Sequence, residues 1–452
     1  MHMRYFLDPF GCVKNQVDAE TMMAHLDRSG WVSAGEPGDA DLIIVNSCGF
    51  IESAKQESIN AVLAWRKQYP GKKLLLAGCL SQRYAAELAE SLPEADVLFG
   101  NRDLSRIGEA AGRAMAGETA APPPPAEAFS AAAAGRRPLL SLPGSAYVKI
   151  SEGCNNRCTF CAIPLIRGPL ASRPVPEILS ECRELLRRGV REINLIGQDT
   201  GSYRGAGAAA GSEAALPDLL EALSTLEGRF WVRILYIHPD NFPLPILDLM
   251  ARDRRFLPYF DIPFQHGSAK ILAAMNRRGS AETYLGLIGT IRARLPAAVI
   301  RSTFMTGFPG ETGADFAALL DFQERARLDW LGCFTYSREE DTPAWAMKDR
   351  VPKKLAAERK RLVEERQIPI TEKNLDRFTG QVYDALVEEK IEGGEGLYLG
   401  RLYAQAPEVD GSAVIRCGDG RRILEPGTFV SGRVFARTGF DLQISAEKRE
   451  KQ

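Results

Sequence analysis

Residues 151–161 read SEGCNNRCTFC and place Cys154, Cys158 and Cys161 in a Cys-x3-Cys-x2-Cys loop. Three thiolates on one short loop can bind three irons of a 4Fe–4S cube and leave the fourth iron without a protein ligand. Such an open iron can bind a small molecule through an amine and a carboxylate. A zinc site usually pairs two Cys-x2-Cys arms or adds histidine. No second arm lies nearby and the chain has only four His, so the spacing favours an iron–sulfur cluster over zinc.

The composition is that of a large globular protein with reduced thiols. The chain has 452 residues, 45% of them hydrophobic and 25% charged, which suggests about three domains with ample core. A net charge of −1 argues against an overall surface for polyanions. We find neither a signal peptide nor a run of about 18 apolar residues. The nine Cys, an odd number without an export signal, then predict a cytoplasmic protein without disulfides or a membrane span.

Residues 1–115 form the first predicted domain. Strand-like stretches at residues 4–7, 41–46 and 73–78 alternate with helical patterns such as 17–26 and 53–66. Strands that alternate with helices predict a parallel, Rossmann-like sheet. Residues 116–139 follow, with four consecutive prolines and an alanine tetrad, and we interpret them as an exposed, flexible linker.

The second predicted domain spans residues 140–377. Its strand candidates are residues 146–150, 192–196, 231–236, 259–262, 299–304 and 330–336, with helical patterns such as 176–188 and 216–226 between them. Six such units predict a partial (β/α)6 barrel with its chemistry at the carboxyl ends of the strands. Residues 204–215 read as a surface loop, and residues 353–377 as a charged helix that breaks near Pro369.

The third predicted domain, residues 378–447, has a different character. Short strand patterns at 382–387, 396–399, 413–416, 428–435 and 441–445 are separated by glycine-rich turns. This spacing predicts a small antiparallel β-barrel of OB-like size. The fold class is therefore α/β, with a Rossmann-like domain first, a partial barrel in the middle and a small β-barrel last.

A second set of cysteines follows the strands of the first domain. Cys12, Cys48 and Cys79 each come after one of the three predicted strands. Ligands of an open parallel sheet bind beyond the carboxyl ends of its strands, so we expect the three thiols to converge at one edge. Scattered cysteines are more often buried small hydrophobic residues. Their common position instead favours a second 4Fe–4S site with an open iron.

The cysteine loop resembles that of the radical S-adenosylmethionine enzymes, and the whole six-cysteine layout resembles the methylthiotransferases among them. Residues 11–20 (GCVKNQVDAE), 46–54 (NSCGFIESA) and 77–80 (AGCL) look like the signatures of that family, as does IPLIRG at 163–168 followed by Ser172-Arg173. The terminal barrel resembles the TRAM domain. Ser47 and Ala19 depart mildly from the family's usual Thr and Ser.

Within this family the chain resembles the RimO type, which modifies an aspartate of small-subunit ribosomal protein twelve. The other branch modifies an adenosine of transfer RNA. Val13-Lys14-Asn15 after Cys12, Phe50-Ile51 after Cys48, and Gln198-Asp199-Thr200 favour the ribosomal branch. Residues 378–445 carry ten acidic and seven basic residues, a balance of −3, which suits a basic ribosomal protein better than RNA. A local RNA patch around Arg421-Arg422 is the competing interpretation.

The resemblance implies two 4Fe–4S clusters and S-adenosylmethionine as cofactors. The cluster on Cys154, Cys158 and Cys161 would cleave S-adenosylmethionine to a 5′-deoxyadenosyl radical, which abstracts hydrogen from the aspartate β-carbon. The cluster on Cys12, Cys48 and Cys79 would supply or carry the sulfur, and a second S-adenosylmethionine would methylate it. Implied partners are the ribosomal protein, free or on the ribosome, and an electron donor such as a flavodoxin or ferredoxin. Transfer RNA is the less favoured substrate.

Four further residues are candidates for contact with S-adenosylmethionine. The resemblance places Phe160 near its adenine, Gly307 and Glu311 lie in a turn that would border it, and Gln198 ends a barrel strand. Core packing for Phe160, and a plain strand-to-helix turn capped by Thr312, remain alternatives. For Arg167 and Arg173 the alternatives are a carboxylate-binding role and surface salt bridges. We assign no catalytic residue beyond the cluster ligands, and expect His238 and His266 to be structural.

Two other functions stay open at this point. The first is the transfer-RNA methylthiotransferase. The second, of a different class, is a zinc-stabilised nucleic-acid-binding module without catalysis. Iron and sulfide analysis separates the zinc module from both enzymes.

Overall fold

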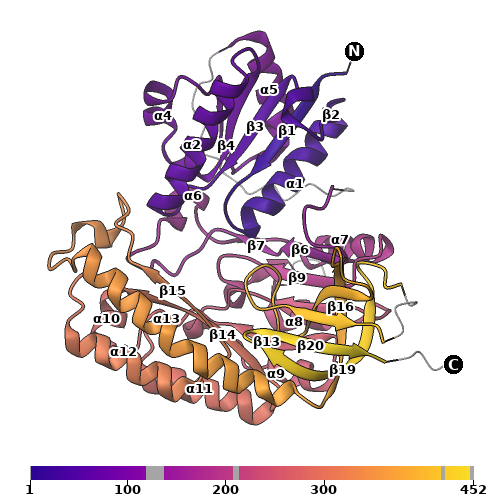
Figure 1. Cartoon of the computed structure of the whole chain (residues 1–452). Helices are drawn as coiled ribbons and strands as arrows, with labels where there is room; N and C mark the ends of the chain where they lie inside the picture. The colour runs from indigo at the N-terminus through magenta and orange to yellow at the C-terminus, as the bar shows by residue number, and fades with distance from the viewer. Residues whose placement is uncertain (1, 119–136, 207–212, 419–422, 448–452) are drawn as a thin grey trace. The chain divides into compact units, whose positions relative to one another are not determined.

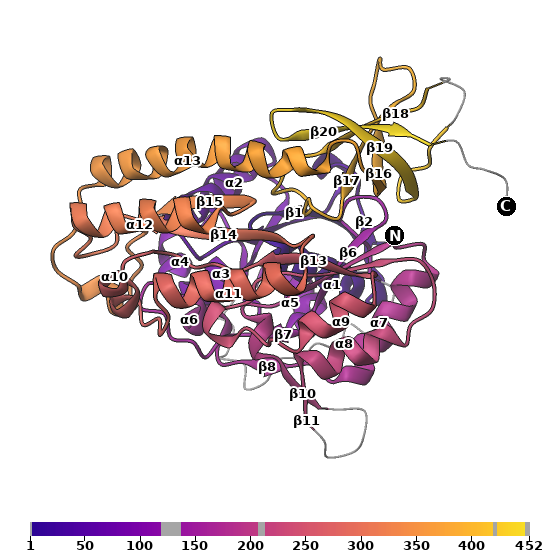
Figure 2. The ribbon, with the colours of Figure 1, turned by 90° about the horizontal axis from the view of Figure 1, so that it is seen from below.

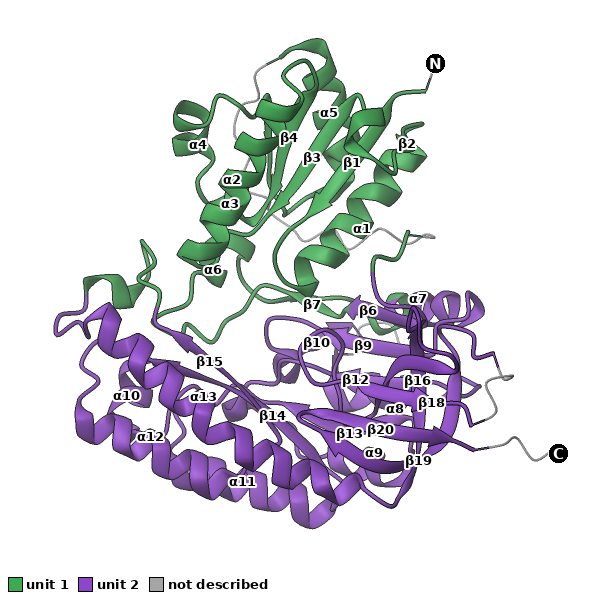
Figure 3. Ribbon diagram, in the orientation of Figure 1, with its two compact units in different colours: residues 1–140, 149–177, 337–346 green, residues 141–148, 178–336, 347–452 purple. Residues whose placement is uncertain are grey.

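The computed structural model describes residues 2–118, 137–206, 213–418 and 423–447, and the chain divides into two compact units (Figure 3). Unit 1 comprises Met1–Leu140, Lys149–Glu177 and Ser337–Ala346. Unit 2 comprises Ser141–Val148, Ile178–Tyr336 and Met347–Gln452. The cysteine loop thus belongs to the same unit as the amino-terminal domain. Most of the predicted linker, residues 119–136, lies outside the described residues.

Unit 1 is built on a parallel sheet with the strand order β2-β1-β3-β4-β5 (Figure 1). Its strands are β1 (Arg4–Pro9), β2 (Val32–Ser33), β3 (Leu42–Ser47), β4 (Lys73–Gly78) and β5 (Val97–Phe99). Its helices are α1 (Val13–Arg28), α2 (Glu52–Gln68), α3 (Cys79–Arg83), α4 (Ala85–Ser91) and α5 (Ile107–Ala116). The predicted Rossmann-like arrangement is confirmed, with β2 and β5 added at its edges.

Alternating residues of the central strands build two cores, one on each face of this sheet. Ile44 and Leu75 belong to a core with Ile107 of α5. Val45 and Leu76 point to the other face and pack with Val62 of α2. Successive side chains of a strand face opposite sides, so a strand buried on both faces is apolar throughout, as residues 42–45 are.

The rest of unit 1 consists of short elements around the cysteine loop. β7 (Ser151–Glu152) pairs with β8 (Ala171–Ser172) as an antiparallel ladder, and α6 (Ile163–Arg167) lies between them in sequence. The segment Ser337–Ala346 also belongs to unit 1 and ends in a short 3-10 helix, η5 (Pro343–Ala346).

Unit 2 contains a six-stranded sheet with the order β15-β14-β13-β12-β9-β6, parallel from β9 to β15. Its strands are β6 (Ser145–Lys149), β9 (Glu192–Ile196), β12 (Trp231–Ile234), β13 (Phe256–Asp261), β14 (Val299–Thr306) and β15 (Trp330–Thr335). Its helices are α7 (Val175–Arg187), α8 (Leu216–Ser224), α9 (Ile246–Arg252), α10 (Ala269–Ala274), α11 (Ala281–Arg294), α12 (Gly313–Ala326) and α13 (Lys353–Leu375). All six predicted strands are present.

The last three α-helices of unit 2 lie next to one another. α11 contacts α12, and α12 contacts α13, which runs along β14 and β15 (Figure 2). The prediction that the last of them breaks at Pro369 was wrong, because α13 continues through Pro369 to Leu375. Between β9 and α8, β10 (Arg204–Ala206) and β11 (Glu213–Ala215) form an antiparallel hairpin, and residues 207–212 between them lie outside the described residues.

The last strands close into the expected small barrel, in the order β16-β17-β18-β20-β19. They are β16 (Val382–Lys390), β17 (Leu397–Leu402), β18 (Ala413–Arg416), β19 (Phe429–Thr438) and β20 (Asp441–Ala446). The barrel is not wholly antiparallel as predicted, because β18 and β20 pair in parallel. Closure leaves no open edge strand in the barrel, which removes a site for edge-to-edge aggregation.

A buried ion cluster links the barrel to the parallel sheet of unit 2. Glu192 of β9 pairs with Arg233 of β12 at 2.9 Å and with Arg401 of β17 at 2.7 Å, and none of the three is more than 2% exposed. Burial would raise the pKa of Glu192, but the two guanidinium groups hold it at about 2.

Among the described residues, no helix is both long enough and apolar enough to cross a bilayer.

Candidate functional site

The ends of three neighbouring strands carry the first set of cysteines. Cys12 precedes α1, Cys48 directly follows β3, and Cys79 directly follows β4 as the first residue of α3. Because β1, β3 and β4 are parallel and adjacent, their carboxyl ends share one edge of the sheet. The expected convergence of the three positions follows from this register.

Glycines let the backbones of this edge approach closely. A Cβ on Gly11 would stand 3.1 Å from Cβ of Cys48, and Gly11 has a φ of +95° that favours glycine. A Cβ on Gly49 would stand 2.7 Å from the backbone oxygen of Cys79. The turns before Cys12 and after Cys48 therefore pack against the next cysteine along the edge.

The three thiols are close enough to change one another's pKa. Burial raises the pKa of Cys48 to about 12, and the Cys79 and Cys12 sulfurs add to that rise. Burial also raises the pKa of Cys79, against the opposing charge of Arg167. Cys12 has an exposed surface, yet the surrounding protein still desolvates its sulfur. The charges of Lys14 and Arg167, together with backbone hydrogen bonds from Asn15 and Lys14, lower its pKa.

The three thiols at this edge are compatible with a 4Fe–4S cluster. Among the described residues, no three His, Cys, Asp or Glu side chains are grouped to share one ion. A 4Fe–4S cube takes each thiolate on a different iron, so its ligands stand farther apart than those of one ion. Three mutually interacting thiols on one sheet edge, with glycines beside them, suit such a cofactor.

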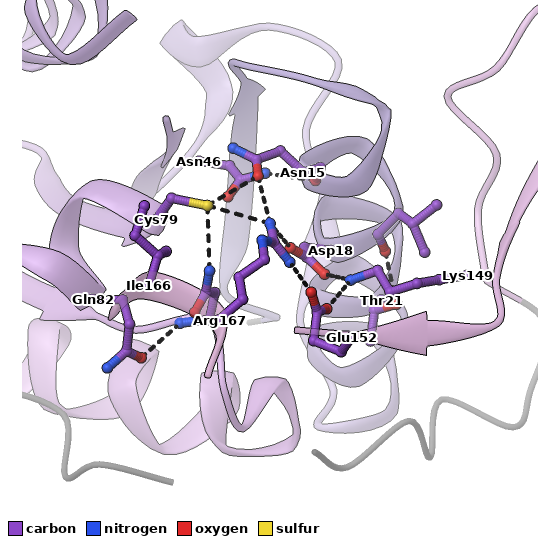
Figure 4. A network of polar contacts seen from close by, with 12 residues as sticks. Asn15, Asp18, Thr21, Asn46, Cys79, Gln82, Lys149, Glu152, Ile166 and Arg167 are labelled. Carbon is purple, nitrogen blue, oxygen red and sulfur yellow. Dashed lines mark hydrogen bonds and ion pairs between the residues drawn. The ribbon is translucent and has the colours of Figure 1, made fainter. Parts of the chain in front are cut away.

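The guanidinium of Arg167 reaches the sulfur of Cys79 (Figure 4). Its Nη2 lies 3.2 Å from Cys79 Sγ and donates to Oδ1 of Asn15 at 2.7 Å. Nδ2 of Asn101 lies 3.3 Å from the same sulfur. Cys79 also packs against Ala162 and Ile166, on the segment that carries Arg167. The second cysteine loop and the sheet edge therefore meet at Cys79 within unit 1.

Four buried charges surround this contact. Arg167 pairs with Asp18 and with Glu152, each at 2.9 Å, and Lys149 pairs with the same two carboxylates. Burial opposes ionisation of Glu152, but Arg167 and Lys149 lower its pKa to about 2. Burial would likewise lower the pKa of Lys149, and the two carboxylates raise it. These shifts keep Glu152 ionised and Lys149 protonated at neutral pH.

The two arginines named from the sequence are not at the surface. Arg167 is 6% and Arg173 8% exposed, so the alternative of surface salt bridges was wrong. Arg167 does bind carboxylates, but those of Asp18 and Glu152 in its own chain. Arg173 donates to the backbone oxygen of Lys149 at 2.9 Å.

The loop with Cys154, Cys158 and Cys161 is fixed at its base by the β7–β8 ladder. Cys154 N–H donates to the Gly168 oxygen at 3.2 Å, and Cys161 N–H to the Cys158 oxygen at 3.0 Å. Gly153 has a φ of +73°, and a Cβ there would stand 2.1 Å from the Pro169 oxygen. Only glycine fits this position, so the ladder presents the three thiols of the loop on one short turn.

The four residues expected near S-adenosylmethionine fall in different units. Phe160 is half-buried in the cysteine loop of unit 1. Gln198, half-buried, follows β9 in unit 2. Gly307 follows β14, and its N–H donates to Glu311 Oε2 at 2.7 Å, while Arg359 donates to Glu311 Oε1 at 2.6 Å. The carboxylate of Glu311 therefore holds its own turn, and Thr312 caps α12 as the alternative interpretation stated.

The histidines after the strands have structural hydrogen bonds. Nδ1 of His238 accepts from the Asp240 N–H at 3.2 Å, and Nδ1 of His266 from the Ser268 N–H at 2.9 Å. Burial, with Arg277 nearby, lowers the pKa of His238 to about 4, so it is neutral at pH 7.

The sequence did not indicate the contacts that Asp18, Lys149, Glu152 and Asn101 make around Arg167 and Cys79. Only their place within or beside the cysteine segments could have indicated them.

Three family models cover the chain in sequence order. Residues 4–100 match the "Uncharacterized protein family UPF0004", residues 148–322 the "Radical SAM superfamily", and residues 379–445 the "TRAM domain". The first range covers the sheet of unit 1 and the third covers the closed barrel. The second covers the cysteine loop and the strands β9 to β14 of the six-stranded sheet, and it ends before β15.

Curated relatives resemble the chain over nearly its full length. A protein of Treponema denticola named "Ribosomal protein uS12 methylthiotransferase RimO" is 45% identical over 97% of this chain and 100% of its own. One of the same name from Pelotomaculum thermopropionicum is 40% identical over 99% of each chain.

Solved structures share the fold at low identity. TsrM of Kitasatospora setae, a radical S-adenosylmethionine methyltransferase solved with cobalamin and a [4Fe-4S] cluster, superposes with a TM-score of 0.54 at 14% identity, over 76% of this chain and 77% of that one. At this identity the likeness shows the fold alone.

Proposed function

Because the chain belongs to the family of ribosomal protein uS12 methylthiotransferases named RimO, we propose that it adds a methylthio group to the β-carbon of an aspartate in ribosomal protein uS12. It is a radical S-adenosylmethionine enzyme by its matched superfamily, and that class works with an iron–sulfur cluster. The observation that carries the proposal is the presence of six cysteines of two sets in one compact unit, in a chain related to this family over its whole length.

We assign the radical cluster to Cys154, Cys158 and Cys161, and an auxiliary cluster to Cys12, Cys48 and Cys79. An unactivated C–H bond yields no usable proton, so side-chain acid–base catalysis does not suffice for this reaction. The bound cofactors supply the radical and the sulfur. The protein supplies six cysteines, three of which are buried, with one set at the ends of strands and the other on a short turn.

Contacts with S-adenosylmethionine are assigned to Phe160, Gln198 and the turn of Gly307 and Glu311. Phe160 precedes Cys161 and offers an aromatic face. Gln198 follows a strand of the parallel sheet, where ligands of such sheets bind. Since Glu311 is engaged by Gly307 and Arg359, its role is to fix the backbone of the turn, and Gly307 is the residue that borders the ligand.

The substrate is a basic ribosomal protein rather than RNA in this proposal. The balance of ten acidic and seven basic residues in 378–445 gives the terminal barrel an excess of negative charge. Electrostatic complementarity then favours a basic partner. A cytoplasmic electron donor such as a flavodoxin or ferredoxin completes the reaction, with uS12 free or on the ribosome as substrate.

One assay decides between the two substrates. The anaerobically reconstituted, reduced enzyme is incubated with S-adenosylmethionine, a sulfide source and either a uS12 peptide containing the aspartate or transfer RNA, and products are weighed by mass spectrometry. A methylthio group on the peptide is expected. Its appearance on adenosine alone would replace the proposed substrate by RNA.

Metal analysis tests the cofactors independently of substrate. Two cubes predict about eight irons per chain, and a zinc module predicts almost none. Cys154→Ala is expected to keep one cluster and lose cleavage of S-adenosylmethionine, whereas Cys79→Ala is expected to retain cleavage and lose transfer of the methylthio group. Retained cleavage in Cys154→Ala would refute the division of roles between the two sets.

A further inference from the structure

Arg167 makes four buried polar contacts, and one of them is not with oxygen. Its guanidinium donates to Asp18, Glu152 and Asn15 at 2.9, 2.9 and 2.7 Å. The fourth contact is the 3.2 Å approach of Nη2 to Sγ of Cys79. Nη2 makes three of the four contacts, with Asp18, Asn15 and the sulfur, and Nη1 makes the fourth with Glu152.

The four charged side chains around Arg167 balance one another without the Cys79 sulfur. Arg167 and Lys149 contribute two positive charges, and Asp18 and Glu152 two negative charges. A buried charge needs a partner, and each of these four has one within the group. The contact with Cys79 is therefore additional to the ion pairs and is not required for their neutrality.

The chain position of Arg167 ties this contact to the other cysteine set. Arg167 is the last residue of α6 and follows Cys161 by six positions. Ala162 and Ile166 pack against Cys79 on the same segment. Arg102 donates to the backbone oxygens of Leu165 and Ile166, two residues of α6, at 3.2 and 3.4 Å. A movement of the cysteine loop would thus move the donor at the Cys79 sulfur.

Hydrogen bonds to the sulfurs and nearby charge set the reduction potential of iron–sulfur clusters. N–H donors and a positive charge stabilise the reduced, more negative state and raise the potential. Cys79 receives one such donor from Arg167 and a second from Asn101. Cys12 and Cys48 also lie within the electrostatic reach of Arg167.

We propose that Arg167 is a positioning residue that holds the Cys79 sulfur as a ligand of the auxiliary cluster and raises the reduction potential of that cluster. This inference rests on the proposed function, because it needs a cluster on Cys12, Cys48 and Cys79. It gives the family's second cluster a defined link to the loop of the first through one side chain.

The test isolates the auxiliary cluster. The triple variant Cys154→Ala/Cys158→Ala/Cys161→Ala is reconstituted with iron and sulfide, and its iron content and midpoint potential are measured anaerobically by EPR-monitored titration. Added to this background, Arg167→Met is expected to shift the potential to more negative values. Arg167→Lys, which keeps the charge but not the fork, is expected to shift it less.

Two further variants separate tuning from loss of structure. Arg167→Met/Asp18→Asn removes the donor together with one negative charge, so the remaining pair of Lys149 and Glu152 is still balanced. This variant is expected to show the same negative shift of the potential. Arg106→Met removes an exposed cation of the same domain that pairs with Glu109, and is expected to leave the potential unchanged. Circular dichroism reports whether each variant is folded.

The outcomes distinguish this inference from the proposed function. A triple variant that binds no iron with Arg167 intact would overturn the auxiliary cluster and, with it, the inference. A bound cluster whose potential is the same in Arg167→Met/Asp18→Asn would overturn the inference alone. Loss of iron from folded Arg167→Met, with recovery in Arg167→Lys, would support it. Unfolding of every Arg167 variant would show that the residue serves only the stability of the fold, and would overturn the inference.

Discussion

Glu339 accepts a 2.7 Å hydrogen bond from Nη1 of Arg83, a residue 256 positions earlier in the chain. The same carboxylate pairs with Lys55 at 3.2 Å and is 2% exposed. Five residues further on, the N–H of Ala344 donates to the oxygen of Thr159 at 2.9 Å, between the second and third cysteines of the loop. The segment Ser337–Ala346 thus connects the amino-terminal sheet domain with the cysteine loop inside unit 1.

Glu339→Gln is expected to loosen this segment, because it removes the carboxylate that pairs with Arg83 and one of the two that pair with Lys55. Its effect should appear as faster proteolysis within residues 337–346 and faster loss of iron from the cysteine loop under a chelator. The neighbouring Glu340, which is exposed, provides the control variant Glu340→Gln. Equal rates of iron loss in both variants would show that the ion pairs do not support the loop.

Gly153→Ala is expected to destroy the radical cluster site and spare the auxiliary one. The added Cβ would meet the Pro169 oxygen at 2.1 Å in a backbone that already has a φ of +73°. Iron should fall from about eight to about four per chain. Gly189→Ala is the control, since Gly189 has a φ of +93° but open space around it. Full iron content in Gly153→Ala would contradict the assigned geometry of the loop.

Gly49→Ala is expected to act on the other set. Its Cβ would approach the backbone oxygen of Cys79 to 2.7 Å, and backbone cannot yield as a flexible side chain does. In the background lacking Cys154, Cys158 and Cys161, the variant should bind much less iron than its parent. Gly71→Ala, at an open position of the same domain, should bind as much as the parent. The prediction fails if both glycine variants retain equal iron.

Glu192→Gln is expected to destabilise unit 2 at neutral pH by about 3–5 kcal/mol, because Arg233 and Arg401 lose their shared carboxylate. The folded pKa of Glu192 is about 2, below the ordinary value of 4.5. Its stabilising effect is therefore complete above pH 4.5 and is lost as the pH falls towards 2.

Urea unfolding of metal-free protein, with and without this substitution, measures the difference. The gap between the two midpoints should be constant from pH 7 to pH 5 and narrow below pH 4.5. A gap that widens on acidification would mean that Glu192 is not held ionised by the two arginines.

The sequence was sufficient to predict the architecture wherever apolar strands and helical patterns alternate regularly. Apolar residues 42–45 and 74–77 indicated buried strands, and a parallel order of these strands predicted that Cys12, Cys48 and Cys79 share one edge. β5 was missed because three residues, Val97–Phe99, are too short to display a period. Pro369 was misjudged because a proline can stay in a long helix when packing on β14 and β15 supports it.

The ion cluster around Arg167 could not be predicted in the same way. Lys149, Glu152 and Arg167 are separated from Asp18 by more than 130 residues, and no periodicity relates them. A buried charge is also indistinguishable from an exposed one in sequence, so the sequence leaves surface salt bridges as an alternative for Arg167 and Arg173. The link from Glu339 to Arg83 was hidden for the same reason.

The two sets of cysteines differ in what must exist before metal can bind. Cys154 to Cys161 span eight consecutive residues, so this turn brings its own sulfurs together. Cys12, Cys48 and Cys79 become neighbours only after β1, β3 and β4 have assembled side by side. In the proposed assignment, maturation of the auxiliary site must therefore wait until the amino-terminal sheet has formed.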